Sequence, residues 1–205
     1  MKASICLVPF NNQKRFFKIL AQVRKAKGLA YEIIVVDNSP TTEIKKHLKK
    51  DEIYISNKNV GKLAGACNKA IARATGGYFV YLCAVHTRIY ADDWLAYMVR
   101  QMDQIGEKYV LGGDLRPFGS MKHIQGGVFI GRTKWMKANL YDEKTHPFTF
   151  MDVYISKRVH RQRLKMLRLG KVFSSMKGWS AKNHAQNKTV KRFKIVHAHE
   201  TYNYN

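Results

Sequence analysis

The sequence predicts a single α/β domain in which a mostly parallel central sheet is flanked by helices. Short apolar segments at 3–8, 32–37 and 78–82 lack polar alternation, which is typical of strands buried on both faces. Segments with apolar residues at helical spacing separate them, at 13–27 and from about 59 to 74. Strands that alternate with helices form parallel sheets with right-handed crossovers, and their ligand sites lie beyond the carboxyl ends of the strands.

The remaining elements have weaker signals. We expect a Lys-rich helix at 41–49 and a short strand at 53–55. In the second half, Asp92 and Asp93 are expected to cap a helix that runs to about residue 104. Strands are expected at 110–115 and 128–130, followed by a helix at 133–138 and a longer basic helix from Asp152 to about residue 169.

Length and composition fit one folded chain, since 205 residues with a hydrophobic fraction of 45% can bury a substantial core. No segment approaches the ~20 apolar residues that span a bilayer. The start of the chain is typical of a buried strand rather than of a signal peptide. Cys6, Cys67 and Cys83 lie in apolar settings without CxxC spacing, which predicts reduced, buried thiols in a cytoplasmic protein.

The charge is strongly positive, with 37 Lys and Arg against 14 Asp and Glu and a formal net charge of +23. Such a chain attracts polyanions, among them nucleic acid, anionic lipid head groups and nucleotide diphosphates. A basic surface without a specific partner explains the charge equally well. A specific nucleic-acid-binding protein is disfavoured, because the basic residues are spread along the chain and no helix-turn-helix, RRM or zinc-finger signature occurs.

Polar residues stand where the expected strands end. Asp37 and Asn38 follow the second strand, and a carboxylate there can accept from a ribose hydroxyl or a base N–H. Asn59-x-Gly61-Lys62 leads into a helix, where Lys62 can meet diphosphate charge. Turn and cap roles explain Asp37, Asn59 and Gly61 as well.

The order of the segments resembles the family 2 inverting glycosyltransferases of the Rossmann-like GT-A fold. The resemblance covers about residues 3–160, and its Thr-Arg and Asp-Trp-Leu pieces look most like bacterial rhamnosyltransferase-type members. It implies a nucleotide-sugar-binding half at 1–90, an acceptor and catalytic half at 91–170 and a basic C-terminal segment at 171–205. The matching segments are Asp37–Ser39, Asn59–Gly61 with Asn68, Gly76–Leu82, Thr87-Arg88, Asp93–Leu95, Gln125–Phe129, Tyr141–Glu143 and Asp152–Ser156.

The resemblance implies transfer of a sugar, with inversion, from a UDP-, dTDP- or GDP-sugar to a hydroxyl of a saccharide or lipid-linked acceptor, as in polysaccharide biosynthesis. The residues implied at the nucleotide sugar are Pro9, Asn11, Asp37, Asn38, Asn59, Gly61, Lys62, Asn68 and Val85. Those implied at the donor sugar and acceptor are Asp114, Gln125, Gly126 and Gly127.

The family places its catalytic base, which takes the proton of the acceptor hydroxyl, in an acidic motif that opens the helix after the acceptor loop. Asp152 matches this motif, with one carboxylate where many members have two. Asp142 and Glu143 in the preceding loop are the other candidates, together with Asp114. A helix N-cap is the structural alternative for Asp152.

The chain departs from the family at the metal motif. The family has Asp-x-Asp where this chain reads Cys83-Ala-Val-His86-Thr87, without any carboxylate. Some relatives, the polypeptide N-acetylgalactosaminyltransferases, have Asp-x-His at this point, and there the histidine binds manganese. The resemblance therefore implies that His86, with His199 or His197 from near the C-terminus, holds Mn²⁺ or Mg²⁺ beside the diphosphate.

Two alternatives to a metal-dependent enzyme stay open. In a metal-independent enzyme, Lys62 or Arg88 would neutralise the leaving diphosphate. In the other alternative, the chain is a basic nucleic-acid- or membrane-binding protein on a glycosyltransferase-like fold without activity. For the enzyme we expect a cytoplasmic location, with the basic stretch 157–192 making peripheral contact with anionic membrane where lipid-linked acceptors lie.

Overall fold

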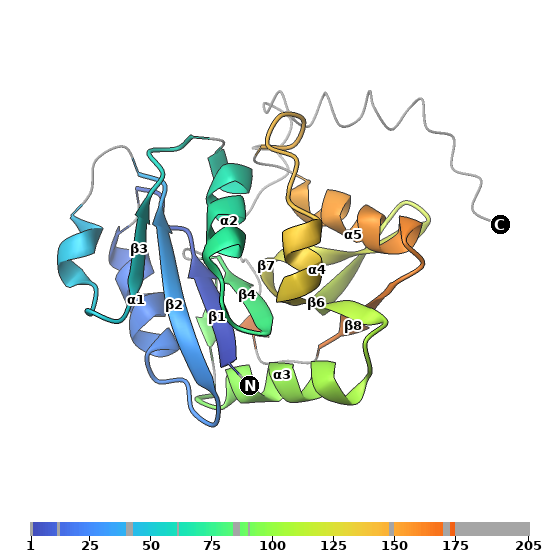
Figure 1. Cartoon of the computed structure of the whole chain (residues 1–205), viewed down its shortest axis with the longest axis horizontal. Helices are drawn as coiled ribbons and strands as arrows, with labels where there is room; N and C mark the ends of the chain where they lie inside the picture. Colours follow the sequence, from blue (N-terminus) through green and yellow to red (C-terminus); the bar gives the residue numbers. More distant parts are fainter. Residues whose placement is uncertain are drawn as a thin grey trace.

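A central mixed sheet of seven strands, in the order β3-β2-β1-β4-β7-β6-β8, organises the chain. Figure 1 shows the computed structural model, which describes residues 2–11, 13–39, 43–60, 62–83, 87–89, 91–147, 150–169 and 173–174. The strands of this sheet are β1 (Lys2–Leu7), β2 (Ala30–Asp37), β3 (Ile53–Ser56), β4 (Tyr78–Leu82), β6 (Tyr109–Phe118), β7 (Met121–Arg132) and β8 (Lys165–Arg168). A separate two-stranded sheet pairs β5 (Arg88–Ile89) with β9 (Phe173–Ser174).

The first four strands of the sheet are parallel, as their apolar sequences predict. In β1, Cys6 lies opposite Ile34 of β2 and Tyr81 of β4, and β2 pairs in parallel with β3. Side chains on both faces of β1, β2 and β4 are buried, because helices cover both sides of this half. The carboxyl ends of these strands therefore meet at one edge of the sheet.

The second half of the sheet is antiparallel around β7. Residues Val128–Arg132 of this strand pair with the whole of β4, and the strand pairs with β6 along most of its length. The register between β6 and β7 shifts between Gly113 and Leu115, so that Asp114 lies opposite the stretch 125–128. A local irregularity of this kind bends the strand and redirects its side chains.

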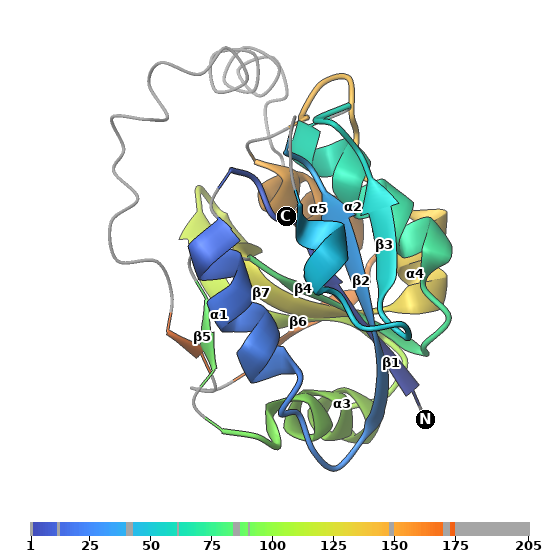
Figure 2. The ribbon, with the colours of Figure 1, turned by 90° about the vertical axis from the view of Figure 1, so that its left-hand side faces the viewer.

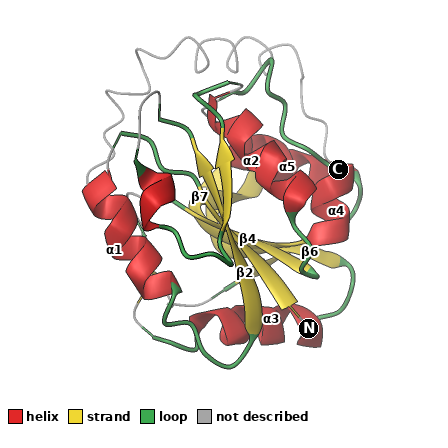
Figure 3. Ribbon diagram, turned by 60° about the vertical axis from the view of Figure 1, so that its left-hand side comes forward, coloured by secondary structure: helices red, strands yellow, loops and turns green. Residues whose placement is uncertain are grey.

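Helices cover the two faces of the sheet and create two cores. Phe16 and Leu20 of α1 pack with Trp94 and Met98 of α3 on one face, and the other face holds a second cluster from α2, α4 and α5. Figure 3 shows the strands between these two groups of helices. The helices are α1 (Gln13–Val23), η1 (Ile44–His47, a short 3₁₀ helix), α2 (Lys62–Arg73), α3 (Trp94–Gln104), α4 (Thr133–Ala138) and α5 (Met151–Arg161).

No helix in the described ranges has the length and apolar character that a membrane crossing needs. The short helix η1 lies beside α1, where the rings of Phe17 and His47 are 4.9 Å apart, and Figure 2 shows the two elements next to each other.

One expectation about the elements was wrong, and two others are borne out only in part. The helix expected from Asp152 to about 169 ends at Arg161, since Arg163 takes a left-handed φ of 56° and Lys165–Arg168 forms β8 beside β6. Tertiary strand pairing overrides the helical propensity of this basic segment. The Lys-rich segment 41–49 forms only η1 in its described part. The Asp93 side chain makes no cap hydrogen bond at α3, although Asp93 occupies the N-cap position.

The three cysteines are free, as predicted, but their burial differs. Cys6 and Cys67 are buried between β1 and α2, and burial raises the pKa of the Cys6 thiol well above its usual value. Cys83, at the end of β4, is only half-buried.

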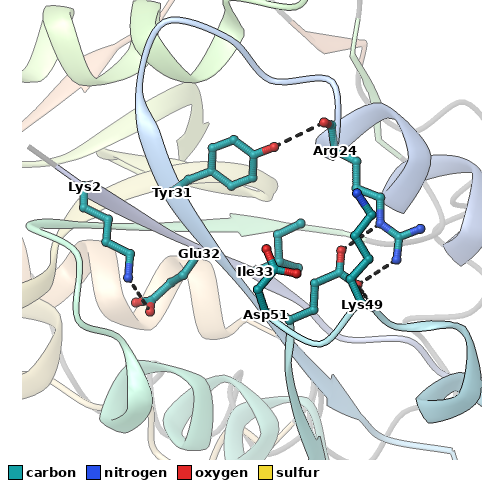
Figure 4. Close-up of a pocket in the computed structure, with 8 residues that line it drawn as sticks. Lys2, Arg24, Tyr31, Glu32, Ile33, Lys49 and Asp51 are labelled. Atoms are coloured by element: carbon teal, nitrogen blue, oxygen red, sulfur yellow. Dashed lines mark hydrogen bonds and ion pairs between the residues drawn. The ribbon is translucent and has the colours of Figure 1, made fainter.

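Glu32 ties together the amino ends of the sheet. Its carboxylate accepts hydrogen bonds from Ser4 Oγ at 2.5 Å, from the backbone N–H of Thr75 at 2.7 Å and from Lys2 Nζ at 3.0 Å. Figure 4 shows Lys2 pointing toward this carboxylate. Burial alone would raise the pKa of Glu32, but these hydrogen bonds outweigh it and lower the pKa to about 2.

Replacing Glu32 by Gln is therefore expected to lower the free energy of unfolding at pH 7 by about 1–3 kcal/mol, the usual range for a lost charged hydrogen bond. The folded-state pKa is depressed, so the carboxylate stabilises the fold above the ordinary value of 4.5 and this contribution disappears as the pH falls toward 2. The difference between wild type and Glu32→Gln should therefore shrink below about pH 4.5.

Urea titrations from pH 7 to pH 3 measure this difference. Glu43→Gln is the matched control, because Glu43 forms an exposed ion pair with Lys46 with both side chains about two-thirds exposed. Equal losses for the two variants at pH 7 would contradict the role given to Glu32.

Candidate functional site

The loops that follow β1, β2 and β3 are joined by hydrogen bonds at the carboxyl edge of the sheet. The backbone N–H of Asn38 donates to Pro9 C=O at 3.0 Å, and that of Asn57 donates to Asp37 C=O at 2.8 Å. The N–H of Asn11 donates to Ser39 Oγ at 3.1 Å. The segments that the sequence predicts at a nucleotide are therefore adjacent and held in one arrangement.

Three asparagine side chains complete this edge. Asn57 Nδ2 donates to Asn38 Oδ1 at 2.6 Å and to Val60 C=O at 2.7 Å, while Asn38 Nδ2 donates to Asn59 Oδ1 at 3.1 Å. Asn59 has a left-handed φ of 61°, which asparagine tolerates better than most residues. Asn38 and Asn57 are buried, whereas Asn59 lies on the surface.

Asp37 stabilises this edge from the interior of the protein. Its side chain is buried, and its carboxylate accepts from the backbone N–H of Ser39 at 3.1 Å and from Tyr54 Oη at 3.2 Å. Burial and the Asp37 charge raise the pKa of Tyr54, so the phenol stays protonated and donates. Asp37 thus orders the loop, and its direct contact with a nucleotide stays a prediction.

The surface groups at this edge are Phe10, Asn11, Asn59, Val60 and Lys62. Phe10 is 46% exposed and Val60 is 64% exposed, which is high for apolar side chains. Phe10 lies between Pro9 and Asn11, which the resemblance implies at the nucleotide sugar, although no motif marks Phe10 itself. An exposed aromatic side chain beside polar asparagines is suited to stack on a nucleobase.

Asn68, expected at the nucleotide sugar, makes hydrogen bonds within the chain, and its contact with a nucleotide stays a prediction. Its amide donates to Tyr141 C=O and to Glu143 Oε1 and accepts from the Tyr141 N–H, at 2.8–3.0 Å. These bonds fix the loop after α4 against α2. Asp142, one of the alternative bases, closes a turn, because the Lys144 and Thr145 N–H groups donate to its Oδ1.

Helix α5 lies along an edge of β7 that no described strand covers, and it satisfies that edge with side chains. The N–H of Gly126 donates to Asp152 Oδ2 at 2.9 Å, and the N–H of Ile124 donates to Ser156 Oγ at 2.9 Å. One turn further, His160 Nε2 lies 3.0 Å from Lys122 C=O. Four helical residues rise about 6 Å and two strand residues advance about 6.6 Å, so three successive turns of α5 match alternate residues of β7.

The carboxylate of Asp152 remains partly accessible to solvent. Its side chain is 26% exposed, and it lies in the first turn of α5, where the helix N-terminus favours negative charge. The N-cap position belongs to Phe150, which makes no side-chain cap bond, so the N-cap alternative for Asp152 is wrong.

Gly126 and Gly127 join Asp152 to the end of β4. Gly126 donates its N–H to Asp152, while the C=O of Gly127 accepts from the Cys83 N–H at 2.8 Å and from Thr87 Oγ1 at 3.3 Å. The two residues thus contact the candidate base on one side and both flanks of segment 84–86 on the other. A Cβ on Gly126 would lie 3.1 Å from Asp152 Oδ2, a tight contact that would require the carboxylate to shift by a few tenths of an ångström.

The predicted acceptor-side residues lie together in the irregular part of the β6–β7 pair. Asp114 lies opposite Gln125, Gly126 and Gly127 in the shifted register. Its carboxylate forms an ion pair with Arg116 at 2.6 Å and is 39% exposed.

The metal predictions fall largely outside the described residues. Val85, His86, His197, His199 and Gly61 all lie there, as do the side chain of Arg88 and the basic stretch beyond residue 174. Within the described ranges, no group of three or more His, Cys, Asp or Glu side chains is arranged to hold a metal ion.

A cavity of about 240 Å³ lies at the opposite end of the parallel strands (Figure 4). Its lining includes Lys2, Arg24, Glu32 and Glu52, which are already paired as Lys2–Glu32 and Arg24–Glu52. Ligand sites of open α/β sheets lie at the carboxyl ends of the strands, so this cavity is not our candidate site.

A family model described as Glycosyl transferase family 2 matches residues 4–164. No curated protein sequence matches the chain significantly.

Solved structures share the fold. The mannosyltransferase PcManGT from Pyrobaculum calidifontis, in complex with GDP-Man and Mn²⁺, superposes with a TM-score of 0.69 over 89% of this chain at 13% identity. TarS 1-349 from S. aureus superposes with a TM-score of 0.65 over 84% of this chain in complex with UDP, and with 0.66 over 89% in complex with UDP-GlcNAc, at 16% and 15% identity. The chain spans only 59–61% of these structures.

The close approach of Asp152 to Gly126 predicts that Gly126→Ala is less stable than Gly127→Ala. Alanine normally gains about 0.4–1 kcal/mol over glycine by restricting the unfolded chain. At Gly126 the new methyl group would push Asp152 away and lengthen its hydrogen bond, whereas at Gly127 it meets no described atom within 4 Å. We expect a difference of about 1–2 kcal/mol in the free energy of unfolding, measured by urea titration. Equal stabilities would contradict the contact between α5 and β7.

Proposed function

Because the chain belongs to glycosyl transferase family 2, we propose that it transfers a sugar from a nucleotide-diphosphate sugar to a hydroxyl acceptor with inversion. The solved structures of the same fold hold GDP-Man, UDP and UDP-GlcNAc. They are longer than this chain and distant in sequence, so the donor of this chain is proposed only as a class: UDP-, GDP- or dTDP-sugar. A dTDP-deoxyhexose belongs in that class because of the resemblance to rhamnosyltransferase-type members.

One observation carries the proposal. The carboxylate of Asp152 is held by Gly126, and the next residue, Gly127, is bonded to Cys83 and Thr87 at both flanks of the segment that replaces the family's metal motif. The candidate base and the segment where the family binds the donor diphosphate are therefore bonded to adjacent residues of β7. The chemistry requires this proximity, because acceptor and donor must meet at one carbon.

In the proposed reaction, Asp152 takes the proton of the acceptor hydroxyl as its oxygen attacks the anomeric carbon. The new bond joins the acceptor oxygen to that carbon, and the bond between the carbon and the diphosphate oxygen breaks. The nucleoside diphosphate leaves with the electron pair from the face opposite to the attack, which inverts the configuration. Asp114 and Gln125, across the irregular part of β6 and β7, are proposed to line the sugars.

The nucleoside is proposed to lie at the carboxyl edge of β1–β3. Phe10 offers a face for the base, and Asn11 and Asn59 offer amide groups on the surface, while the buried Asn38 acts through the loop that it orders. Pro9 and Asp37 act through the loop that they order, and Lys62, exposed at the start of α2, adds positive charge for the diphosphate.

A divalent ion, Mn²⁺ or Mg²⁺, would neutralise the leaving diphosphate, with His86 and either His199 or His197 as its proposed protein ligands. The alternative without metal assigns this task to Lys62 and Arg88. The basic surface also supports peripheral contact with anionic membrane lipid, since the net charge is +23. The second candidate function, a binding protein without transfer activity, is favoured by the altered Asp-x-Asp motif.

The variant Asp152→Asn is expected to lose transfer while keeping donor binding. Asparagine keeps the oxygen that accepts from Gly126 but cannot take a proton, and loss of a general base typically lowers the rate about 10²–10⁴-fold. Turnover with a screened donor and acceptor, nucleotide affinity and melting temperature are measured together. Normal turnover at normal stability would exclude Asp152 as the base and direct attention to Asp114, Asp142 or Glu143.

Divalent metal is expected to strengthen nucleotide diphosphate binding. Calorimetry with UDP, GDP and dTDP in Mn²⁺, Mg²⁺ or EDTA measures the effect, and His86→Ala should weaken the metal-dependent part about 10–100-fold. His47→Ala, an exposed histidine of η1, is the control. Equal affinity with metal and with EDTA would remove the metal from the proposal, and binding of no nucleotide would favour the inactive alternative.

A further inference from the structure

His123 on β7 is a largely covered titratable side chain with no role in the function proposed above. Its side chain is only 13% exposed, and its ring meets Phe118 edge-on at 5.9 Å. Phe118 also contacts Phe150, the residue that precedes α5, at 5.9 Å. The tip of the β6–β7 hairpin thus fixes the imidazole beside the first turn of α5.

The two ring nitrogens of His123 face different surroundings. Nε2 lies 4.0 Å from Asp152 Oδ2, the oxygen that accepts from the Gly126 N–H. Nδ1 is buried, and no described residue pairs with it. If the proton were on Nδ1, an unpaired donor would be buried and the lone pair of Nε2 would point toward the Asp152 carboxylate. A proton on Nε2 leaves only an unpaired acceptor, which costs less, and directs a donor at Asp152.

The contact is too long for a hydrogen bond, so the N–H dipole acts on the carboxylate electrostatically. Other described groups also lie near Asp152, but they act on its carboxylate in other ways. The Gly126 and Val153 N–H groups donate to the carboxylate. Tyr141 is buried, and burial raises its pKa well above its usual value, so it remains a neutral phenol.

We propose that His123 is a positioning residue for Asp152: its Nε2–H fixes Oδ2 on the side of Gly126, so that the carboxylate presents its remaining lone pairs to the acceptor hydroxyl. This role rests on the proposed function of Asp152 as the base. Because the buried ring cannot reach a substrate with Nδ1, His123 acts through Asp152 and not on the acceptor itself.

Three variants separate this role from simple packing. His123→Phe keeps the ring against Phe118 and removes the donor, whereas His123→Gln keeps a donor and loses the ring. His160→Phe is the matched control, since His160 belongs to the same α5–β7 contact but lies two helical turns from Asp152.

We expect His123→Phe to lower kcat about 3–30-fold with little change in KM, because the lost interaction is electrostatic and acts through the base. His123→Gln should recover most of this loss, and His160→Phe should keep the wild-type kcat. In the Asp152→Asn background, His123→Phe should have no further effect on the residual rate, as expected for two residues that act as one unit. Equal kcat for wild type and His123→Phe, or equal losses in the Phe and Gln variants, would overturn the proposal.

A measurement without substrate decides the geometry independently. Nitrogen-15 NMR of the imidazole ring is expected to show the neutral His123 protonated at Nε2, with a resonance that moves in Asp152→Asn and stays in place in His160→Phe. A ring protonated at Nδ1, or one that does not respond to Asp152→Asn, would overturn the proposal whether or not a donor has been found. Wild-type turnover in Asp152→Asn would instead show that Asp152 is not the base. The NMR result would then still describe the contact between His123 and Asp152, but that contact would have no catalytic role.

Discussion

The contact between α5 and β7 determines how the second half of this chain is built. Strand β4 pairs with β7 only over Val128–Arg132, so the neighbouring stretch 122–126 has free backbone groups on one edge. Unpaired groups of this kind are costly when buried. Side chains of α5 at residues 152, 156 and 160 satisfy them at the spacing of one helical turn per two strand residues. Of these bonds, the one from Gly126 also holds the Asp152 carboxylate in place, so at this position the pairing of the sheet edge and the geometry of the candidate base have one cause.

A different constraint applies to the first half of the sheet. Its parallel strands end at one edge, where the loops must bring several polar backbone groups together without burying them unpaired. Asp37, Asn38 and Asn57 do this from inside, through bonds to Ser39, Tyr54, Asn59 and Val60. The groups left on the surface are Phe10, Asn11 and Asn59. The residues that shape the nucleotide edge are therefore distinct from those able to touch a ligand.

The sequence predicts the parallel strands well, because apolar segments such as Ile33–Val36 and Phe79–Leu82 have only one arrangement that buries both faces. It fails where pairing is non-local. Lys165–Arg168 is basic and compatible with a helix, and only the free edge of β6 makes it a strand. The site follows the same division: Asp152 and Gly126 could be found from motif order, but the bond between them depends on a helix–strand contact 26 residues apart in sequence. His123 carried no signal in the sequence, and Ser156 appeared only as the last residue of the matched segment Asp152–Ser156, because the contacts of both residues depend on α5 lying on β7.

The altered metal motif has limited consequences for the other half of the site. The described hydrogen bonds of the Asp152 carboxylate come from the backbone of β7 and from α5, and none comes from segment 83–87. That segment is attached to the next residue of the same strand, through Gly127 C=O. The proposed replacement of the family's Asp-x-Asp by Ala84-Val85-His86 therefore leaves the described hydrogen bonds of Asp152 in place. In the proposed reaction, activation of the acceptor and neutralisation of the leaving group then depend on different residues, so the missing motif carboxylates alone do not argue against Asp152 as the base.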